Sequence, residues 1–305
     1  MNSSAPVPRR AGSLRAQRRR EVIEAYLYLL PTFVGLILFS LGAIVVSVGI
    51  SFTDWNVLQP PHWVGLSNYV RLFSTPLNWQ VFGNTLYYMG VIVPVGTALA
   101  LGLALALNRG LRGIVVLRSL YFLPVISSTV AVSLVWGWLY NQQFGLINYL
   151  LSLVGITGPA WLADTRTAMP AVIIMSIWKG LGYNMVIFLA GLQGIPQELY
   201  EAAAIDGAGA WARFRYVTLP LVSPTTFFVV VLSTIAAFQV FDQTYVMTGG
   251  GPAYSTTTLA LFIYQNAFQW FHMGYAAALS YVLFAAVAVV TLVQFRVQGR
   301  FVFYR

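Results

Sequence analysis

Residues 201–210 read EAAAIDGAGA, a small and partly charged stretch that interrupts a long apolar sequence. Its three consecutive alanines favour a helix and add almost no side-chain bulk. Gly207 and Gly209 follow them, and glycine is the residue that most often ends a helix. The stretch therefore predicts a short helix and a turn between two apolar segments, within a loop that covers residues 193–220.

The flanking residues extend this prediction to a helix–turn–helix. Pro196 suits the first position of a helix, where its missing N–H costs nothing, and Glu198 falls in the first turn, where the helix dipole favours negative charge. A second short helix, WARFRYVT, is expected to run until Pro220 opens the next apolar segment. The slim first helix could enter a groove of another protein and present Glu201 and Asp206 there. An ordinary solvated connection is the plainer alternative.

The composition on both sides of this loop is that of an integral membrane protein. Of the 305 residues, 58% are hydrophobic and 8% are charged, and the mean hydropathy is +0.74. A soluble domain is about 25% charged. Because the chain contains no cysteine, disulfides, metal thiolate sites and a cysteine nucleophile are excluded.

Six segments are long and apolar enough to cross a membrane as helices. They cover residues 26–52, 84–107, 116–139, 168–192, 219–244 and 275–297. If successive loops alternate between the two sides of the membrane, all but three of the 17 basic residues fall on the same side; the exceptions are Arg71, Arg166 and Lys179. Basic residues beside spans favour the cytoplasm, so both termini are expected there. We predict an all-α membrane protein with a basic cytoplasmic tail at 1–25 and a six-helix transmembrane domain at 26–305.

The arginine-rich start of the chain has two other interpretations. A nucleic-acid-binding arm could look like this, but basic residues beside a membrane span are typical of the cytoplasmic side, so no nucleic-acid partner is expected. A signal peptide would have an apolar region of only about 7–15 residues. The apolar run from Tyr26 to Phe52 is far longer, so we expect an uncleaved first span.

The sequence offers little that could catalyse a reaction. Its one lysine, Lys179, stands in IWKGLG between Trp178 and Gly180, whereas a P-loop needs glycine before the lysine and serine or threonine after it. The only histidines, His62 and His272, lie in predicted outer loops. The eight carboxylates are scattered. We therefore predict that the chain is not an enzyme and holds no cofactor or metal of its own.

The stretch EAAAIDGAGAWARFRYVTLP resembles the EAA loop of permease subunits of binding-protein-dependent ABC importers. Two further stretches resemble the carbohydrate-uptake branch of this family, which includes maltose-type and glycerol-3-phosphate-type permeases. They are GYNMVIFLAGLQGIPQELYEAAAIDGA, and FQVFDQTYVMTGGGP followed by TTTLALFIYQNAF. The resemblance covers the chain from Tyr26 on. The residues that match the loop motif are Glu201, Ala202, Ala203, Gly207, Leu219 and Pro220.

The resemblance implies a type I ABC importer permease bundle in the bacterial cytoplasmic (inner) membrane. Such a permease pairs with a second permease, usually a related but different chain. Two ATPase subunits bind ATP and Mg, and each receives one EAA loop in a groove, while an extracytoplasmic solute-binding protein delivers the substrate. ATP binding then tilts the bundles from inward-open to outward-open, with Glu201 as the contact and Gly207 as the joint of the lever.

A substrate path is expected beside the two spans that flank the loop. Lys179 lies about 13 residues, or roughly 20 Å, above the end of its span, where a charge is a functional candidate. The family's sugar contacts match Lys179, Gly180, Ser233 and Ala237, although alanine replaces the family's polar side chain at Ala237. Trp178, Tyr183 and Phe238 could stack on a sugar ring. The candidate path comprises Trp178, Lys179, Gly180, Tyr183, Asn184, Ser233, Ala237, Phe238 and Val240.

Alternatives remain for the lysine and for the substrate. Lys179 could instead snorkel or bond a freed backbone carbonyl. A di- or oligosaccharide is the preferred substrate, but a lone cation also suits a glycerol phosphate. An ion-coupled transporter could use Lys179 and Asp242, which counting places roughly 15 Å apart in depth. A scaffold without transport is a further alternative.

Asp242 is expected to orient the turn TGGGP at 248–252, and this turn is expected to stop the fifth span.

Overall fold

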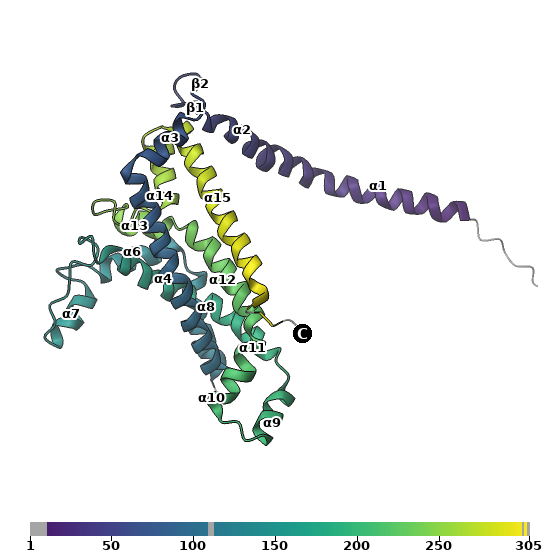
Figure 1. Ribbon diagram of the computed structural model, residues 1–305, viewed down its shortest axis with the longest axis vertical. Coiled ribbons are helices and arrows are strands. Elements are labelled where there is room, and N and C mark those ends of the chain that lie inside the picture. Colours follow the sequence, from purple (N-terminus) through teal and green to yellow (C-terminus); the bar gives the residue numbers. More distant parts are fainter. Residues whose placement is uncertain (1–10, 109–112, 301, 304–305) are drawn as a thin grey trace, which may run out of the picture.

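A computed structural model describes residues 11–108, 113–300 and 302–303, and it is almost wholly helical (Figure 1). Of the basic residues that determined the predicted topology, Arg9, Arg10, Arg109, Arg112 and Arg305 lie outside this part of the chain. Within it, four helices are long and apolar enough to cross a membrane unbroken, and two further helix pairs are bent. The described residues therefore provide six spans if each bent pair counts as one.

The first span is a long rod that leaves the rest of the molecule (Figure 1). Helix α1 (Ala11–Gly35), a π-helical turn (Leu36–Leu41) and α2 (Gly42–Ser51) follow one another without a break. None of its most apolar window is buried within this chain, and its main contact with the bundle is between α2 and α15 (Met273–Val297). Residues 11–25 of the predicted tail are helical and continue into the span, and residues 1–10 lie outside the described residues.

A small cap joins the rod to the bundle. Strands β1 (Thr53–Asp54) and β2 (His62–Trp63) pair antiparallel, and α3 (Ser67–Ser74) follows them. The Asn68 side chain donates hydrogen bonds to the carbonyl oxygens of Ser51 and Thr53, both at 2.9 Å. This buried amide therefore fixes the corner at which the first span ends.

The bundle is built around α4 (Pro76–Leu107) and α8 (Ala168–Gln193), which pack along much of their length. The α4 helix begins eight residues before its predicted span because Thr75 is extended and Pro76 takes the first helical position. Two buried clusters hold these helices together, one formed around Met185, Phe188 and Val222 and the other around Tyr88 and Val172. Tyr88 of the second cluster also lines the cavity described below.

The predicted span 116–139 is not one continuous helix. The segment forms α5 (Ile114–Ile126) and α6 (Thr129–Leu139), which meet at 98°. Pro124 lies in the last turn of α5, and Ser127 at the junction is extended. Helix α7 (Leu146–Leu153) follows and lies to the side of the bundle in Figure 1.

The fifth span also differs from its prediction, 219–244, at both ends. A nearly continuous helical segment made of α10 (Ala210–Arg213), a π-helical turn (Phe214–Thr218) and α11 (Leu219–Leu221) passes through Pro220 and bends by 62° into α12 (Ser223–Phe238). At its far end, α12 stops before Gln239. The TGGGP turn ends the next helix, α13 (Asp242–Thr248), through a left-handed Gly249, and so does not end the span.

The remaining helices begin at the end of the bundle beside the cap (Figure 1). Helix α14 (Leu259–Tyr264) continues as a π-helical turn (Gln265–Gln269), and α15 then returns across the bundle to a 3-10 turn (Gln298–Arg300). Three threonines, Thr256, Thr257 and Thr258, are fully buried where the chain leaves the TGGGP turn, and their hydroxyls bond nearby backbone oxygens. This part of the bundle is thus held by hydrogen bonds as well as by apolar packing.

Candidate functional site

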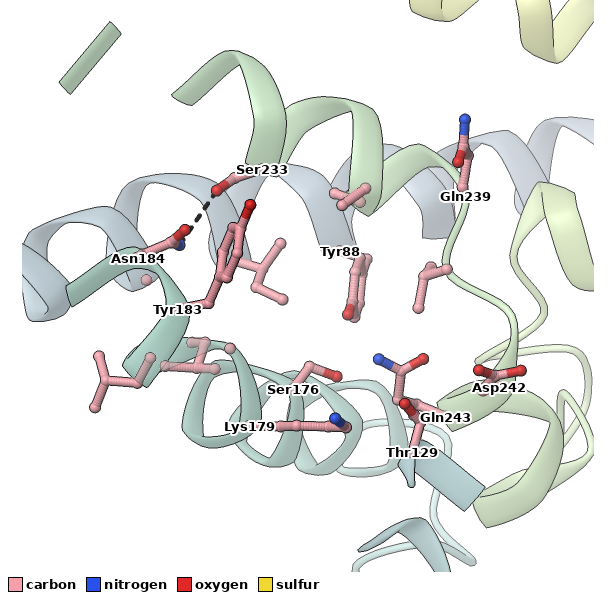
Figure 2. A pocket seen from close by; sticks show the side chains of 18 of the residues that line it. Tyr88, Thr129, Ser176, Lys179, Tyr183, Asn184, Ser233, Gln239, Asp242 and Gln243 are labelled. Atoms are coloured by element: carbon pink, nitrogen blue, oxygen red, sulfur yellow. Dashed lines mark hydrogen bonds between the residues drawn. The ribbon is translucent and has the colours of Figure 1, made fainter. Parts of the chain in front are cut away.

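A cavity of about 550 Å³ lies between α4, α8, α12 and the segment that follows α12 (Figure 2). This volume is within the range of small-molecule sites, about 300–1,000 Å³. Seven residues of the candidate substrate path line it: Lys179, Gly180, Tyr183, Asn184, Ser233, Ala237 and Val240. The structure therefore brings most of that predicted set to one place.

The helical repeat explains which side chains face this cavity. Ser176, Gly180 and Tyr183 follow one another at intervals of four and three residues, so they share one face of α8. On the opposite wall α12 contributes Ser233 and Ala237. The Asn184 amide donates to the Ser233 hydroxyl at 3.3 Å and so connects the two walls (Figure 2).

Two predicted path residues, Trp178 and Phe238, do not line the cavity. The Trp178 ring packs on Trp136 with 5.5 Å between centroids, and the Phe238 side chain is only 3% exposed. Neither ring is therefore placed to stack on a solute in this cavity. Tyr183, which is 48% exposed, is the aromatic side chain of the predicted set that does face it.

The cavity is also lined by polar residues outside the candidate substrate path. They come from helices α4, α6 and α8 and from the chain after α12, and are Tyr88, Thr129, Ser176, Gln239, Asp242 and Gln243. Because α12 ends at Phe238 and the chain turns back, Asp242 lines the same cavity as Lys179. The depth estimate that separated these two charges assumed a helix to residue 244, whereas α12 ends at Phe238.

Lys179 bonds the backbone at the break between α5 and α6. Its ammonium group donates to the carbonyl oxygens of Pro124 at 3.3 Å and Ser127 at 3.1 Å. The last carbonyls of a helix have no partner within it, and they carry the negative end of its dipole. Of the two roles weighed for this side chain, bonding freed carbonyls is therefore observed, and the same residue also contributes to the cavity wall.

Two glycines on α8 have different surroundings. A Cβ atom at Gly182 would collide with the carbonyl group of Tyr121 on α5, whereas a Cβ atom at Gly180 would meet nothing within 4 Å. Gly182 therefore permits the close crossing of α5 and α8, and Gly180 leaves space in the cavity. Both consequences follow from a missing side chain, but only the first concerns helix packing.

The predicted helix–turn–helix is present between α8 and α12. Helix α9 (Gln197–Ile205) starts one residue later than expected, since Pro196 takes the N-cap position instead of the first helical position. Gly207 has a φ of +78°. The N–H groups of Gly207 and Ala208 donate to the carbonyls of Ala204 and Ala203 at 3.0 and 2.9 Å. This is a Schellman motif, which requires a left-handed residue and so favours glycine at 207.

The motif residues of this loop lie mainly on its exposed side. Glu201, Ala202, Asp206 and Gly207 are exposed, and Ala203, Leu219 and Pro220 are half-buried. The Glu201 carboxylate accepts a hydrogen bond from Gln197 at 3.0 Å.

Sequence reasoning missed an apolar patch beside these residues. Ile205 is 87% exposed and Trp211 is 74% exposed. Exposed large apolar side chains grouped near a polar rim are typical of a protein interface. Their position immediately beside the EAA residues could have indicated them.

A hydrogen bond and apolar packing fix the loop to the bundle. The hydroxyl groups of Tyr200 on α9 and Thr218 lie 3.0 Å apart, and Tyr200 packs against the cluster that contains Met185 and Val222. These contacts connect α9 to the ends of α8 and α12 that adjoin the loop. Within the described ranges, no group of three or more His, Asp or Glu side chains could hold a metal ion.

Comparison with known proteins gives consistent results. Residues 92–302 match the family described as "Binding-protein-dependent transport system inner membrane component". The trehalose/maltose transport system permease protein MalF of Thermococcus litoralis is 37% identical over 92% of this chain and 95% of its own length. The sn-glycerol-3-phosphate transport system permease protein UgpA of Yersinia enterocolitica is 37% identical over 80% of this chain and 82% of its own.

The fold is also similar to a solved structure. A chain from the crystal structure of a bacterial ABC transporter involved in the import of the acidic polysaccharide alginate superimposes with a TM-score of 0.82. The match covers 94% of this chain and 99% of the other, at 24% sequence identity.

Proposed function

This chain belongs to the inner-membrane components of binding-protein-dependent transport systems, and from that premise we propose that it imports a di- or oligosaccharide across the cytoplasmic membrane with energy from ATP. Two separate ATPase subunits bind ATP and Mg, a second permease completes the path, and an extracytoplasmic binding protein supplies the solute. Both termini lie in the cytoplasm in this proposal.

The observation that carries the proposal is the connection between the cavity and the exposed loop. Helices α8 and α12 line the cavity, and the segment from α9 to α11 joins their inner ends directly. The Tyr200–Thr218 contact makes this segment a stiff unit. An ATPase subunit whose groove holds Glu201, Ile205 and Trp211 can therefore rotate the cavity walls when that subunit moves.

The charges of the cavity favour a neutral carbohydrate. Lys179 and Asp242 are the charged side chains of its lining, and their formal charges cancel. Two hydrogen-bonding positions of the ammonium are already taken by carbonyl oxygens. Amide, hydroxyl and tyrosine groups remain to bind sugar hydroxyls. A glycerol phosphate, which the name of the UgpA relative suggests, is the second candidate because Lys179 has no carboxylate bonded to it.

The shared position of Lys179 and Asp242 would also suit an ion-coupled transporter. Membership of the binding-protein-dependent family favours ATP as the energy source instead. The two possibilities differ in uptake measurements. In proteoliposomes that contain the complete transporter, uptake should follow ATP supply and persist when the proton gradient is dissipated. Uptake that stops with the proton gradient while ATP is present would refute the proposal.

A glycine pair tests the cavity itself. Gly180→Leu should fill it and reduce solute uptake at least tenfold, whereas Gly90→Leu on α4 is the matched control, since a Cβ atom meets nothing within 4 Å there either and Gly90 does not line the cavity. Both variants should still copurify with the ATPase subunits. Equal uptake by the two variants would show that the solute passes elsewhere. Competition by disaccharides or by glycerol phosphate in the same assay identifies the substrate class.

A further inference from the structure

A second cavity, of about 600 Å³, lies where the foot of α12 meets the end of α15. Figure 1 shows this end of α15 beside α11 and α12, at the opposite end of the helix from the cap. Most of its wall is apolar and includes Phe227, Val230 and Val297, while Arg215 and Arg300 stand among the lining residues. This cavity is separate from the one between α8 and α12, and the two share no residue.

The chain that follows α15 completes this cleft. The backbone N–H of Phe303 donates to the Ser223 hydroxyl at 3.0 Å, and the N–H of Val302 donates to the Gln298 carbonyl at 2.8 Å. These bonds hold residues 302–303 against the start of α12 and provide the cleft with a third wall. The cavity is therefore framed by three segments that are distant in sequence.

Neither arginine forms an ion pair with a described residue. No Asp or Glu lines this cavity, and the one ion pair found among the described residues, Arg20 with Glu24, is elsewhere. Arg215 lies over the Tyr216 ring at 5.8 Å, which leaves its charge unneutralised. Two exposed cations beside an apolar cleft complement a ligand that has an anionic head and an apolar tail.

We propose that this cleft binds one anionic phospholipid, with its phosphate between Arg215 and Arg300 and an acyl chain along Phe227, Val230 and Val297. The topology proposed above places the site in the cytoplasmic leaflet, which is where anionic lipids and juxtamembrane arginines meet. The apolar wall distinguishes a lipid from free phosphate, which would gain nothing from it.

The position of Arg215 gives this lipid a role. Arg215 belongs to the π-helical turn that leads from the exposed loop into α11, whereas Arg300 belongs to the turn after α15. A phosphate that contacts both residues connects the loop that moves with the partner subunits to a span on the other side of α12. Binding therefore stabilises one orientation of the loop relative to α15.

The test uses the whole transporter, purified with its second permease and ATPase subunits. Native mass spectrometry would measure binding of phosphatidylglycerol and of phosphatidylcholine with the same acyl chains. Variants Arg215→Gln, Arg300→Gln and the pair are compared with Arg296→Gln, which removes an exposed arginine from the last turn of α15 without touching the cleft. Inorganic phosphate and glycerophosphoglycerol serve as soluble competitors.

The wild-type complex should retain one phosphatidylglycerol per copy of this chain in preference to phosphatidylcholine. Each cleft variant should weaken that binding about fivefold, and Arg296→Gln should leave it unchanged. Equal weakening by Arg296→Gln would show a general surface charge effect and overturn the proposal, as would displacement of the lipid by either soluble anion. If the permease pair alone binds the lipid but the complex with ATPase subunits does not, the occupant of the cleft in the complex is a protein and the proposal is overturned.

Discussion

Two apolar helix pairs in the described part of the chain are bent, and the two breaks complete their hydrogen bonding in different ways. Between α5 and α6 the direction changes by 98°, and the carbonyls of Pro124 and Ser127 are bonded by Lys179 from another helix. Between α11 and α12 the change is 62°, and the Ser223 hydroxyl donates to the carbonyl of Pro220 at 2.6 Å. The first break depends on a distant residue and the second on a neighbour.

The difference follows from where each break lies. The first adjoins the cavity inside the bundle, where a backbone group without a protein partner costs several kcal/mol (about 2 or more). The second lies beside the exposed loop, where water can replace a lost bond. A break that is held by another helix ties α5, α6 and α8 into one unit, whereas a break that is satisfied locally can serve as a hinge between the loop and α12.

The largest effect should come from removing the distant donor. In Lys179→Met the two carbonyls lose their partner, and we expect the unfolding free energy of the purified complex to fall by about 3 kcal/mol, since each lost charged hydrogen bond is worth about 1.5–3 kcal/mol and release of the half-buried charge offsets part of this. Thermal unfolding in mild detergent measures the change. Lys179→Arg is the control, and it should lose less than half as much because it keeps the charge and its donors. Unchanged stability in the Met variant would show that the break does not need this side chain.

A smaller loss is expected where α5 crosses α8. Gly182→Ala forces a methyl group against the carbonyl of Tyr121, and such overpacking costs about 1–3 kcal/mol. Gly180→Ala, two residues earlier on the same helix, meets open space and should be neutral or slightly stabilising. The same unfolding measurement applies to both. If the two alanines behave alike, the close approach of the helices does not contribute to the first break.

In the loop beside the second break, Gly207→Ala should reduce coupling to the ATPase subunits more than it reduces stability. Alanine at a φ of +78° costs about 1 kcal/mol and opposes the Schellman turn. We expect stability of the permease pair to change little, while stimulation of ATP hydrolysis by the binding protein falls several-fold. Gly209→Ala is the matched control, because Gly209 has an extended backbone that alanine can adopt. A similar loss of stimulation in both variants would mean that helix propensity, not the turn, is responsible.

The smallest effect should be that of Ser223→Ala at the second break. The variant loses the bond to the Pro220 carbonyl and the acceptor for the Phe303 N–H, yet water can reach both groups. A loss of about 0.5–1 kcal/mol is therefore expected in the unfolding experiment. A loss as large as that of Lys179→Met would contradict the distinction between a remote and a local break.

The sequence predicts the unbroken spans well and the broken ones poorly, for a physical reason. The predicted spans 84–107, 168–192 and 275–297 lie inside the helices Pro76–Leu107, Ala168–Gln193 and Met273–Arg300. Hydropathy measures how many apolar residues follow one another, but it contains nothing about their direction. A 98° bend between Ile126 and Thr129 leaves the apolar run over 116–139 intact.

The site shows the same limit. The helical repeat correctly groups Gly180 with Tyr183, and Ser233 with Ala237, because it depends only on local geometry. It could also have excluded Trp178, which lies two positions from Gly180 and so faces a different side of α8. The approach of Asp242 depends on where α12 stops, and no residue before Gln239 marks that end with a glycine or proline.

The first span and α12, the straight part of the fifth span, differ in how their lengths match the thickness of a bilayer. The rod Gln17–Ser51 has 35 residues and α12 has 16. At 1.5 Å per residue they measure about 52 and 24 Å, against a hydrocarbon layer of about 30 Å. The rod spans any natural membrane with length to spare, whereas α12 is too short unless lipids thin around it or neighbouring protein covers its ends. Hydrophobic mismatch is thus concentrated on the helix that forms one wall of the cavity.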